Sequence, residues 1–466
     1  MLVAATLALV SPAAPGRAQS DPAALEAAAI RAFEEGNTED AIAYYRRASA
    51  ALEEPSEVIR VALLVALLEH DRGRDNAAIN TLAEALALDV RYRLPPERYD
   101  QDFERLFRTA RDRAVISRQN RALKLVESAS EDIRAGRFDL ARNALDRALV
   151  LAPDTPSALY NLAYLDLRAG HEDAALAGFE RLIARSASPD GDPISDPLRA
   201  QALTNLGYLY ARRQQHAEAA DALEEAVSLA PQMASAWLNL GLERQALGAA
   251  ASARQAFERA HALDPEDPAA IRYLAEARIK DGDHQGAAAL LEDALAHAPS
   301  GADLWYTLAR AQAGLGHDPG PAYASALQAD PDDHRGFGAL AAFQLARRAC
   351  DAADATSCDA YATRALALRP GWVEALMIRA RARRTLGDLA GAQDALELAT
   401  RTDPTRADAF NNLGNIYCLS HERERAEKAF QRAVQIDPSL AVARDNLAMV
   451  RAGGCPPGPV RSHPEQ

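Results

Sequence analysis

A step of 34 residues recurs along most of this chain and limits its possible folds more than any other feature. Leucines, alanines and prolines each return at that step. The recurring residues are Leu206, Leu240, Leu274 and Leu308, then Ala226, Ala260 and Ala294, then Pro231, Pro265 and Pro299, and farther along Pro370, Pro404 and Pro438. A fixed period of this length indicates one small supersecondary unit stacked many times. Function is then expected on an extended surface and not in a catalytic pocket.

One unit can be followed between residues 407 and 440. Its apolar and small residues are spaced by three and four, as Phe410, Leu413, Gly414 and Tyr417 and then as Ala426, Phe430 and Ala433. This spacing is typical of amphipathic helices and not of strands. Gly414 and Ala426 let two antiparallel helices approach closely, and Pro438 ends the second helix because proline has no N–H. Each unit is therefore predicted to be a helical hairpin.

The hairpin resembles the tetratricopeptide repeat (TPR) family. Two units match the TPR pattern at its anchor positions, Trp237, Leu240, Gly241, Ala253, Phe257, Ala260 and Pro265 in one and Leu203, Leu206, Gly207, Tyr210, Ala219, Ala226 and Pro231 in the other. Some units depart from it: Arg244, Arg278 and Arg383 replace an aromatic residue of the first helix, and Arg379 replaces its leucine. The resemblance covers nearly the whole chain. It implies an all-α, right-handed superhelical solenoid of about 10–11 hairpins with a C-terminal capping helix.

Interruptions of the repeat predict how the chain is organised. The period lapses after Arg93, where Pro95 and Pro96 break the chain and Phe103 and Phe107 then follow at helical spacing. Two further insertions, at 186–196 and 350–358, lengthen connections. We expect a signal peptide over 1–18, N-terminal TPR-like hairpins over 22–92, a connecting helix over 93–121, the main solenoid over 122–440, a capping helix over 441–452 and a disordered tail over 453–466.

The first residues have the pattern of an export signal. Residues 2–10 are apolar but too few to span a membrane, and Gly16 and Ala18 place small residues where a signal peptidase reads them. No Lys or Arg precedes Arg17, which suggests that translation starts upstream of Met1. This pattern predicts a periplasmic or secreted protein whose mature chain begins at Gln19. The alternative is a cytoplasmic protein with an alanine-rich first helix.

The four cysteines form two candidate pairs, as an oxidising compartment would permit. Cys350 and Cys358 flank a lengthened turn inside one hairpin. Cys418 ends the first helix of the last repeat, and Cys455 follows the capping helix that should lie beside it. We predict a disulfide in each pair. A buried free thiol at Cys358 is the alternative.

Composition and motifs argue against several classes of function. Lys and Arg total 52 against 66 for Asp and Glu, and the resulting net charge of −14 opposes non-specific attraction to nucleic acid or anionic lipid. Phosphate-binding loops, nucleophile elbows and Cys-x-x-Cys pairs are absent from the sequence. Histidines at the hairpin turns should lie too far apart to share a zinc ion. We therefore expect no enzyme, no metal, no cofactor, no small-molecule substrate and no transmembrane segment, and a protein or peptide as the partner.

Asparagines mark the candidate binding groove. They stand one residue before the leucine position of the first helix, as Asn161, Asn205, Asn239, Asn412 and Asn446. The TPR resemblance implies that this position faces the concave groove, where an amide can donate to and accept from a peptide backbone. Tyrosines and arginines would extend the groove, namely Tyr160, Tyr164, Tyr208, Arg310, Arg381 and Arg384. The alternatives are structural asparagines and arginines paired with acids of adjacent repeats.

These observations predict an exported scaffold that binds an extended or helical segment of another protein within a bacterial envelope assembly. One alternative is a cytoplasmic TPR adaptor. The other is an accessory or regulatory subunit whose solenoid positions substrate for a separate enzyme.

Overall fold

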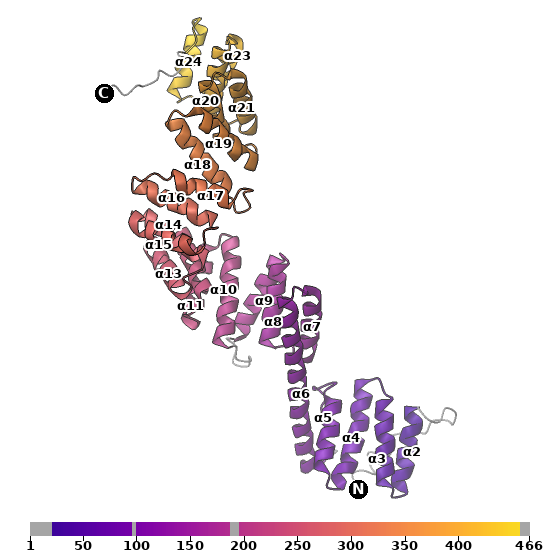
Figure 1. Cartoon of the computed structure of the whole chain (residues 1–466). Coiled ribbons are helices and arrows are strands. Elements are labelled where there is room, and N and C mark those ends of the chain that lie inside the picture. The colour runs from indigo at the N-terminus through magenta and orange to yellow at the C-terminus, as the bar shows by residue number, and fades with distance from the viewer. Residues whose placement is uncertain (1–20, 96–98, 187–194, 457–466) are drawn as a thin grey trace. The chain divides into compact units, whose positions relative to one another are not determined.

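The computed structural model describes residues 21–95, 99–186 and 195–456, and these fold almost entirely as α-helices (Figure 1). The predicted signal peptide lies outside the described residues, as do most of the 186–196 insertion and the tail beyond residue 456. The helices are α2 (Pro22–Glu34), α3 (Thr38–Ala50), α4 (Pro55–Asp71), α5 (Asp75–Leu86), α6 (Gln101–Arg134), α7 (Phe138–Leu151), α8 (Pro156–Arg168), α9 (Glu172–Ser186), α10 (Asp196–Arg212), α11 (His216–Leu229), α12 (Ala234–Ala246), α13 (Ala250–Leu263), α14 (Pro268–Lys280), α15 (His284–His297), α16 (Ala302–Gly314), α17 (Gly320–Ala329), α18 (Phe337–Asp351), α19 (Ala355–Leu368), α20 (Val373–Thr385), α21 (Leu389–Thr402), α22 (Ala407–Leu419), α23 (Arg423–Ile436) and α24 (Ala441–Arg451).

Consecutive helices pack in pairs, so the predicted all-α fold of helical hairpins is confirmed. The pairs run from α2 with α3 to α22 with α23, and α24 packs on α23 as the capping helix. The chain divides into two compact units, one ending at Leu209 and one beginning at Tyr210. The first helices of some neighbouring hairpins also contact one another, namely α6 with α8, α14 with α16, α16 with α18 and α18 with α20.

A single turn motif closes every hairpin. In ten of the eleven hairpins the residue just before the second helix donates its backbone N–H to the carbonyl five residues earlier, as Asp388 does to Arg383 at 2.9 Å. In the α16–α17 hairpin the donor is His317, three residues before α17 begins. The residue before the donor takes a positive φ, which glycine adopts without a steric penalty. Glycine fills this position in eight hairpins, at Gly36, Gly73, Gly136, Gly170, Gly248, Gly282, Gly316 and Gly387, whereas Gln214, Ala353 and His421 fill it in the other three.

We expect glycine at position 353 to stabilise the protein by about 1 kcal/mol or less. Ala353 has φ 60°, a conformation in which its Cβ crowds the backbone. The matched control is Ala352→Gly, because Ala352 has φ −80° and gains nothing from the lost side chain. Urea unfolding midpoints of the two variants should move in opposite directions. A shift of both variants toward lower stability would contradict the assignment of strain to residue 353.

The predicted boundary between a connecting helix and the next hairpin does not exist. The structure has one helix, α6, of 34 residues, which serves as connector in its first half and as the first helix of the hairpin with α7 in its second. The physical reason is local: residues 101–134 contain no glycine or proline to end the helix. At its centre, Arg118 donates to the carbonyls of Ala87, Val150 and Leu151 at 2.8–2.9 Å and so caps both α5 and α7.

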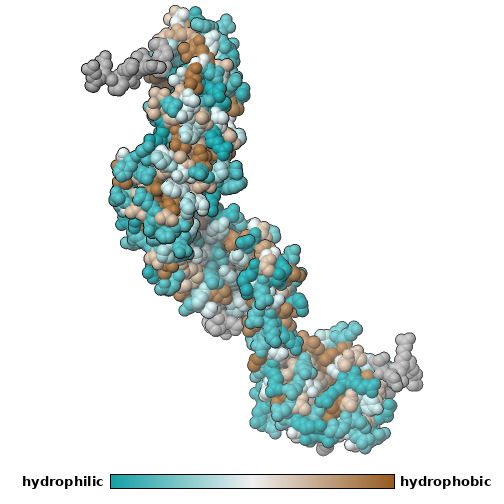
Figure 2. Space-filling view, in the orientation of Figure 1, coloured by the Kyte–Doolittle hydropathy of each residue, from teal (hydrophilic) through white to brown (hydrophobic). Residues whose placement is uncertain are grey.

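The small and aromatic residues that recur in the repeat are buried. Alanines fill most of the contacts between helices, and single aromatic rings such as Phe257 and Phe430 are fully buried among them. A Cβ added to Gly414 would lie 2.6 Å from the Phe430 ring, so only glycine lets these two helices pack as they do. On the face visible in Figure 2, hydrophobic residues form separate patches within a hydrophilic surface. Among the described helices, none combines the length and apolar character needed to cross a membrane.

Candidate binding cleft

A cleft of about 540 Å³ opens in the C-terminal unit among the first helices α20 and α22 and the capping helix α24. This volume is in the usual range of ligand sites. Its lining combines apolar side chains with amides and two arginines: Met377, Ile378, Ala380, Arg381, Arg384, Leu396, Asn411, Asn412, Asn415, Ile416, Val442, Asn446 and Pro456. The cleft therefore pairs apolar area with hydrogen-bonding groups, and its lining within the described parts of the chain contains no acidic side chain.

The asparagines of the cleft divide into a structural group and an available one. Asn446 is buried and donates to the side-chain carbonyls of Asn411, at 2.9 Å, and of Asn415, at 3.4 Å, which ties α24 to α22. Asn412 is half-buried and has no side-chain hydrogen bond to any residue that the structure describes. Asn412 is thus an amide free to bind a peptide group, whereas Asn446 is held by its neighbours.

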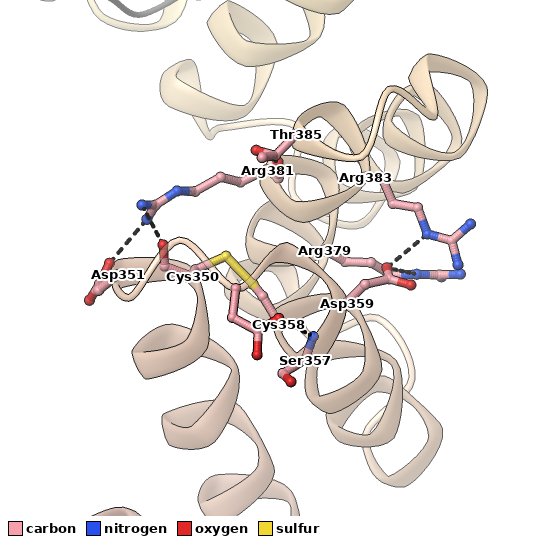
Figure 3. Close-up of a disulfide and its surroundings, with 10 residues drawn as sticks. Cys350, Asp351, Ser357, Cys358, Asp359, Arg379, Arg381, Arg383 and Thr385 are labelled. Atoms are coloured by element: carbon pink, nitrogen blue, oxygen red, sulfur yellow. Dashed lines mark hydrogen bonds and ion pairs between the residues drawn. A yellow bond between two sulfur atoms is a disulfide. The ribbon is translucent and has the colours of Figure 1, made fainter. Parts of the chain in front are cut away.

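The two arginines of the cleft differ in the same way. Arg381 reaches the carboxylate of Asp351 and the carbonyl of Cys350, both at 3.2 Å (Figure 3). Arg384, one turn farther along α20, is half-buried and has no hydrogen bond or ion pair within the described parts of the chain. Burial lowers the pKa of Arg384 below its usual range, and the nearby charge of Arg381 lowers it further. An anion beside Arg384 would remove this penalty.

The remaining arginines of α20 lie on another side of the helix. Figure 3 shows Arg379 and Arg383 directed toward Asp359 and away from Arg381. Arg383 is 2.7 Å from Asp359 and from Asp388, and Arg379 is 3.7 Å from Asp359. Arg379 and Arg383 replace TPR anchor residues, and their ion pairs with Asp359 join α20 to α19 of the preceding hairpin. They leave Arg381 and Arg384 as the cations of the cleft.

Two disulfides brace the repeats on either side of Arg384. Cys350 is bonded to Cys358 between α18 and α19, with a Cα–Cα distance of 5.1 Å (Figure 3). Cys418 is bonded to Cys455 with a Cα–Cα distance of 5.7 Å, which joins α22 to the chain after α24. Pro456 lies in the cleft wall and directly follows Cys455. The second bridge therefore holds part of the wall in place.

The other predicted groove residues lie elsewhere. In the N-terminal unit, Asn161 donates to Ser130 at 3.3 Å and Asn205 donates to the Tyr160 hydroxyl at 3.1 Å. Burial raises the pKa of Tyr160, and its ring stacks on Tyr164 with centroids 6.5 Å apart.

The remaining predictions fall on both units. Tyr208 is exposed in the N-terminal unit, Asn239 is half-buried in the C-terminal unit, and Arg310 is exposed on α16. The structure thus gathers Asn412, Asn446, Arg381 and Arg384 into one cleft and leaves the rest outside it.

Several residues of the cleft were missed by sequence reasoning. The cleft is also lined by Asn411, Met377 and Val442. These residues alternate with core positions in the sequence, so no pattern distinguished them as lining a cleft. Asn415 had a usable signal, because it stands one 34-residue step after Arg381, and Arg347 stands one step before. Within residues 21–95, 99–186 and 195–456, no group of three or more His, Cys, Asp or Glu side chains is arranged to hold a metal ion.

Five stretches of the chain match family models described as the tetratricopeptide repeat. They are residues 127–192, 200–233, 234–267, 278–319 and 407–440. In the C-terminal unit they include the hairpin of α12 and α13 and that of α22 and α23 beside the cleft, whereas α18 to α21 lie outside the matched stretches. No curated protein sequence matches the chain.

Solved structures with similar folds share little sequence with the chain. The APC/C hetero-tetramer Cut9–Hcn1 is 15% identical over 93% of this chain and 96% of its own, with a TM-score of 0.36. Yeast Tom70 is 14% identical over 92% and 95%, with a TM-score of 0.37. YrrB, a TPR protein with an unusual peptide-binding site, is 20% identical over 48% and 97%, with a TM-score of 0.30. Likeness at this level concerns the helical-hairpin fold alone.

Proposed function

Because this chain belongs to the tetratricopeptide repeat family, we propose that it is an exported scaffold that holds an extended segment of a partner protein in the cleft of α20, α22 and α24. TPR hairpins are protein-interaction scaffolds. The observation that carries this proposal is the cleft itself, where the free amide of Asn412 and the unpaired Arg384 lie beside apolar side chains. An extended segment supplies the peptide groups and side chains that such a lining binds.

The rigidity of the cleft favours binding of a flexible segment. Two disulfides, the hydrogen bond between Asn446 and Asn411, and the bonds from Arg423 to the Val450 carbonyl hold the surrounding helices. A largely preformed surface loses little conformational entropy on binding, so the cost of ordering falls on the partner. The scaffold therefore needs no reaction chemistry of its own to select a partner.

Export is supported by the pattern of residues 1–18 and by the pairing of all four cysteines. A disulfide persists in an oxidising compartment and is rare in the cytosol. We propose the bacterial envelope as the location, either the periplasm or the exterior of the cell. Intact-mass analysis of the native protein should find Gln19 as its first residue, and soluble cytoplasmic protein that retains residues 1–18 would contradict export.

Binding in the cleft can be tested with a photo-crosslinking amino acid at position 412 in living cells. Peptide mapping should then show one partner segment joined to the cleft. The matched control carries the same amino acid at position 428, since Lys428 is exposed on α23 and does not line the cleft. Equal crosslinking from both positions would remove the cleft as the binding site. A captured enzyme whose rate depends on this protein would favour the accessory-subunit alternative.

A further inference from the structure

We propose that the segment held in the cleft is acidic and that its carboxylates bind a row of arginines running from Arg310 through Arg347 and Arg381 to Arg384. This inference rests on the proposed function above. It defines the chemistry of the partner: an extended protein segment with acidic side chains at a regular spacing. The row is formed by three consecutive first helices, α16, α18 and α20.

The repeat places these arginines in one row. Arg347 and Arg381 are separated by one 34-residue step, so they occupy the same position on neighbouring first helices, which contact each other directly. Arg310 lies on α16, which contacts α18. Arg310 stands six residues before Gly316, the positive-φ residue of its hairpin turn, just as Arg347 stands six residues before Ala353 and Arg381 six before Gly387. The three arginines therefore occupy equivalent positions in their hairpins.

The arginines of the row are available for a ligand. Arg310 and Arg347 are exposed and form no ion pair with any residue in the described parts of the chain. Arg348, beside them, is bound to Asp318 and is not part of the row. Arg381 has a partner in Asp351, but both side chains are more than half exposed. Exposed pairs of this kind contribute little and exchange readily for a better-placed carboxylate.

Arg384, the last arginine of the row, has the greatest need for a counter-ion. Arg384 is half-buried without a counter-ion among the described residues, and the described lining of the cleft contains no Asp or Glu that could supply one. A carboxylate bound there forms charge-assisted hydrogen bonds in a partly desolvated site, where such bonds are strong. The chain as a whole carries a net charge of −14, which opposes general attraction of polyanions, so an acidic segment has to bind through local contacts with the row.

Helix spacing determines where the acids should stand. Packed helices lie about 8–10 Å apart, and an extended chain advances about 3.3–3.6 Å per residue. One acid roughly every three residues therefore matches Arg310, Arg347 and Arg381. Arg381 and Arg384 lie one turn apart on the same helix, about 5–6 Å between Cβ atoms, so the last acid should follow after about two residues.

The test measures binding of fluorescent synthetic peptides to the full chain with its disulfides intact. The first peptide carries Glu at positions 1, 4, 7 and 9 within a Ser/Ala background, the second has the same composition with the four Glu residues in one block, and the third replaces Glu by Gln. We expect the first to bind most tightly. In the protein, Arg384→Gln should weaken it about tenfold or more, the loss of roughly one charge-assisted contact, and Arg347→Gln about twofold to fivefold. Arg432→Gln, on α23 outside the cleft, is the charge-matched control.

Register can be tested by charge reversal. Arg347→Glu should abolish the preference for the first peptide, and Lys at position 4 of that peptide should restore binding to this variant. Equal binding of the spaced, blocked and neutral peptides would overturn the inference, and so would equally tight binding of a single-stranded DNA of the same charge. If position 412 crosslinks in cells to a partner segment without acidic residues, the inference fails while the proposed function stands.

Discussion

Replacing Phe430 by alanine is expected to lower the free energy of unfolding of the C-terminal repeats by about 3–5 kcal/mol, the usual cost of removing a buried aromatic ring. Phe430 has no exposed surface, and its ring packs on the backbone of Gly414 in the partner helix of the hairpin. Alanine leaves a cavity between α22 and α23. Hydrogen exchange of these two helices, together with thermal unfolding, should report the loss. Lys428→Ala, at an exposed site of the same helix, should change stability by about 0.5 kcal/mol or less.

A second substitution makes this prediction sharper. Gly414→Leu should destabilise the protein when made alone, since even a Cβ at this position would lie 2.6 Å from the Phe430 ring. In the Phe430→Ala background the added leucine enters the space that the ring has left. The double variant should therefore be more stable than the sum of the two single effects implies. Strict additivity would show that the two residues do not pack as the structure places them.

Removing the bridge between Cys418 and Cys455 is expected to destabilise the capping helix by about 2–4 kcal/mol. This bridge joins residues 37 positions apart and holds α24 over the last hairpin. The Cys418→Ser, Cys455→Ser variant should show faster hydrogen exchange in α24. Because Pro456 and Val442 line the cleft, its partner affinity should also fall.

The bridge between Cys350 and Cys358 provides the comparison. It closes only a short turn between α18 and α19, so its removal should leave α24 unchanged. Non-reducing peptide mapping of the native protein should show both links. Four alkylatable thiols in that protein would exclude both bridges and would withdraw their support for an oxidising compartment.

Residues that are close together in the sequence were sufficient to predict the repeating unit. The 3.6-residue period of apolar and small residues sets each helix, a positive-φ glycine or its substitute ends the first helix, and Pro438 marks the end of a unit. The capping helix was predictable for the same reason, because it is one more amphipathic segment next to the last hairpin. Cys350 and Cys358 could be paired because they flank one turn, but the prediction that this turn is lengthened was wrong. Residues 352–354 join α18 to α19 with the same turn that joins α20 to α21. These features depend on residues that are near one another in the chain.

The same local information predicted a wrong boundary within α6. The repeat lapses near residue 93, and a boundary was expected again at residue 122 where the pattern resumes. The helix continues across that point because nothing in residues 101–134 breaks it. The packing partners of a helix can change along its length without any change in its backbone conformation. Periodicity therefore located the hairpin but not the start of its first helix.

The sequence alone thus determined the helices other than α6, the hairpins, the cap and the cysteines available for pairing. Tertiary structure decided which polar groups remain free, because that depends on side chains one repeat away. Of the α20 arginines, Arg379 and Arg383 meet Asp359, while Arg384 meets no carboxylate in the described residues. Among the asparagines, Asn205 is bound to Tyr160 and Asn446 to Asn411, while Asn412 stays available. A repeat gives equivalent positions the same orientation, but their partners come from neighbouring repeats, whose residues differ.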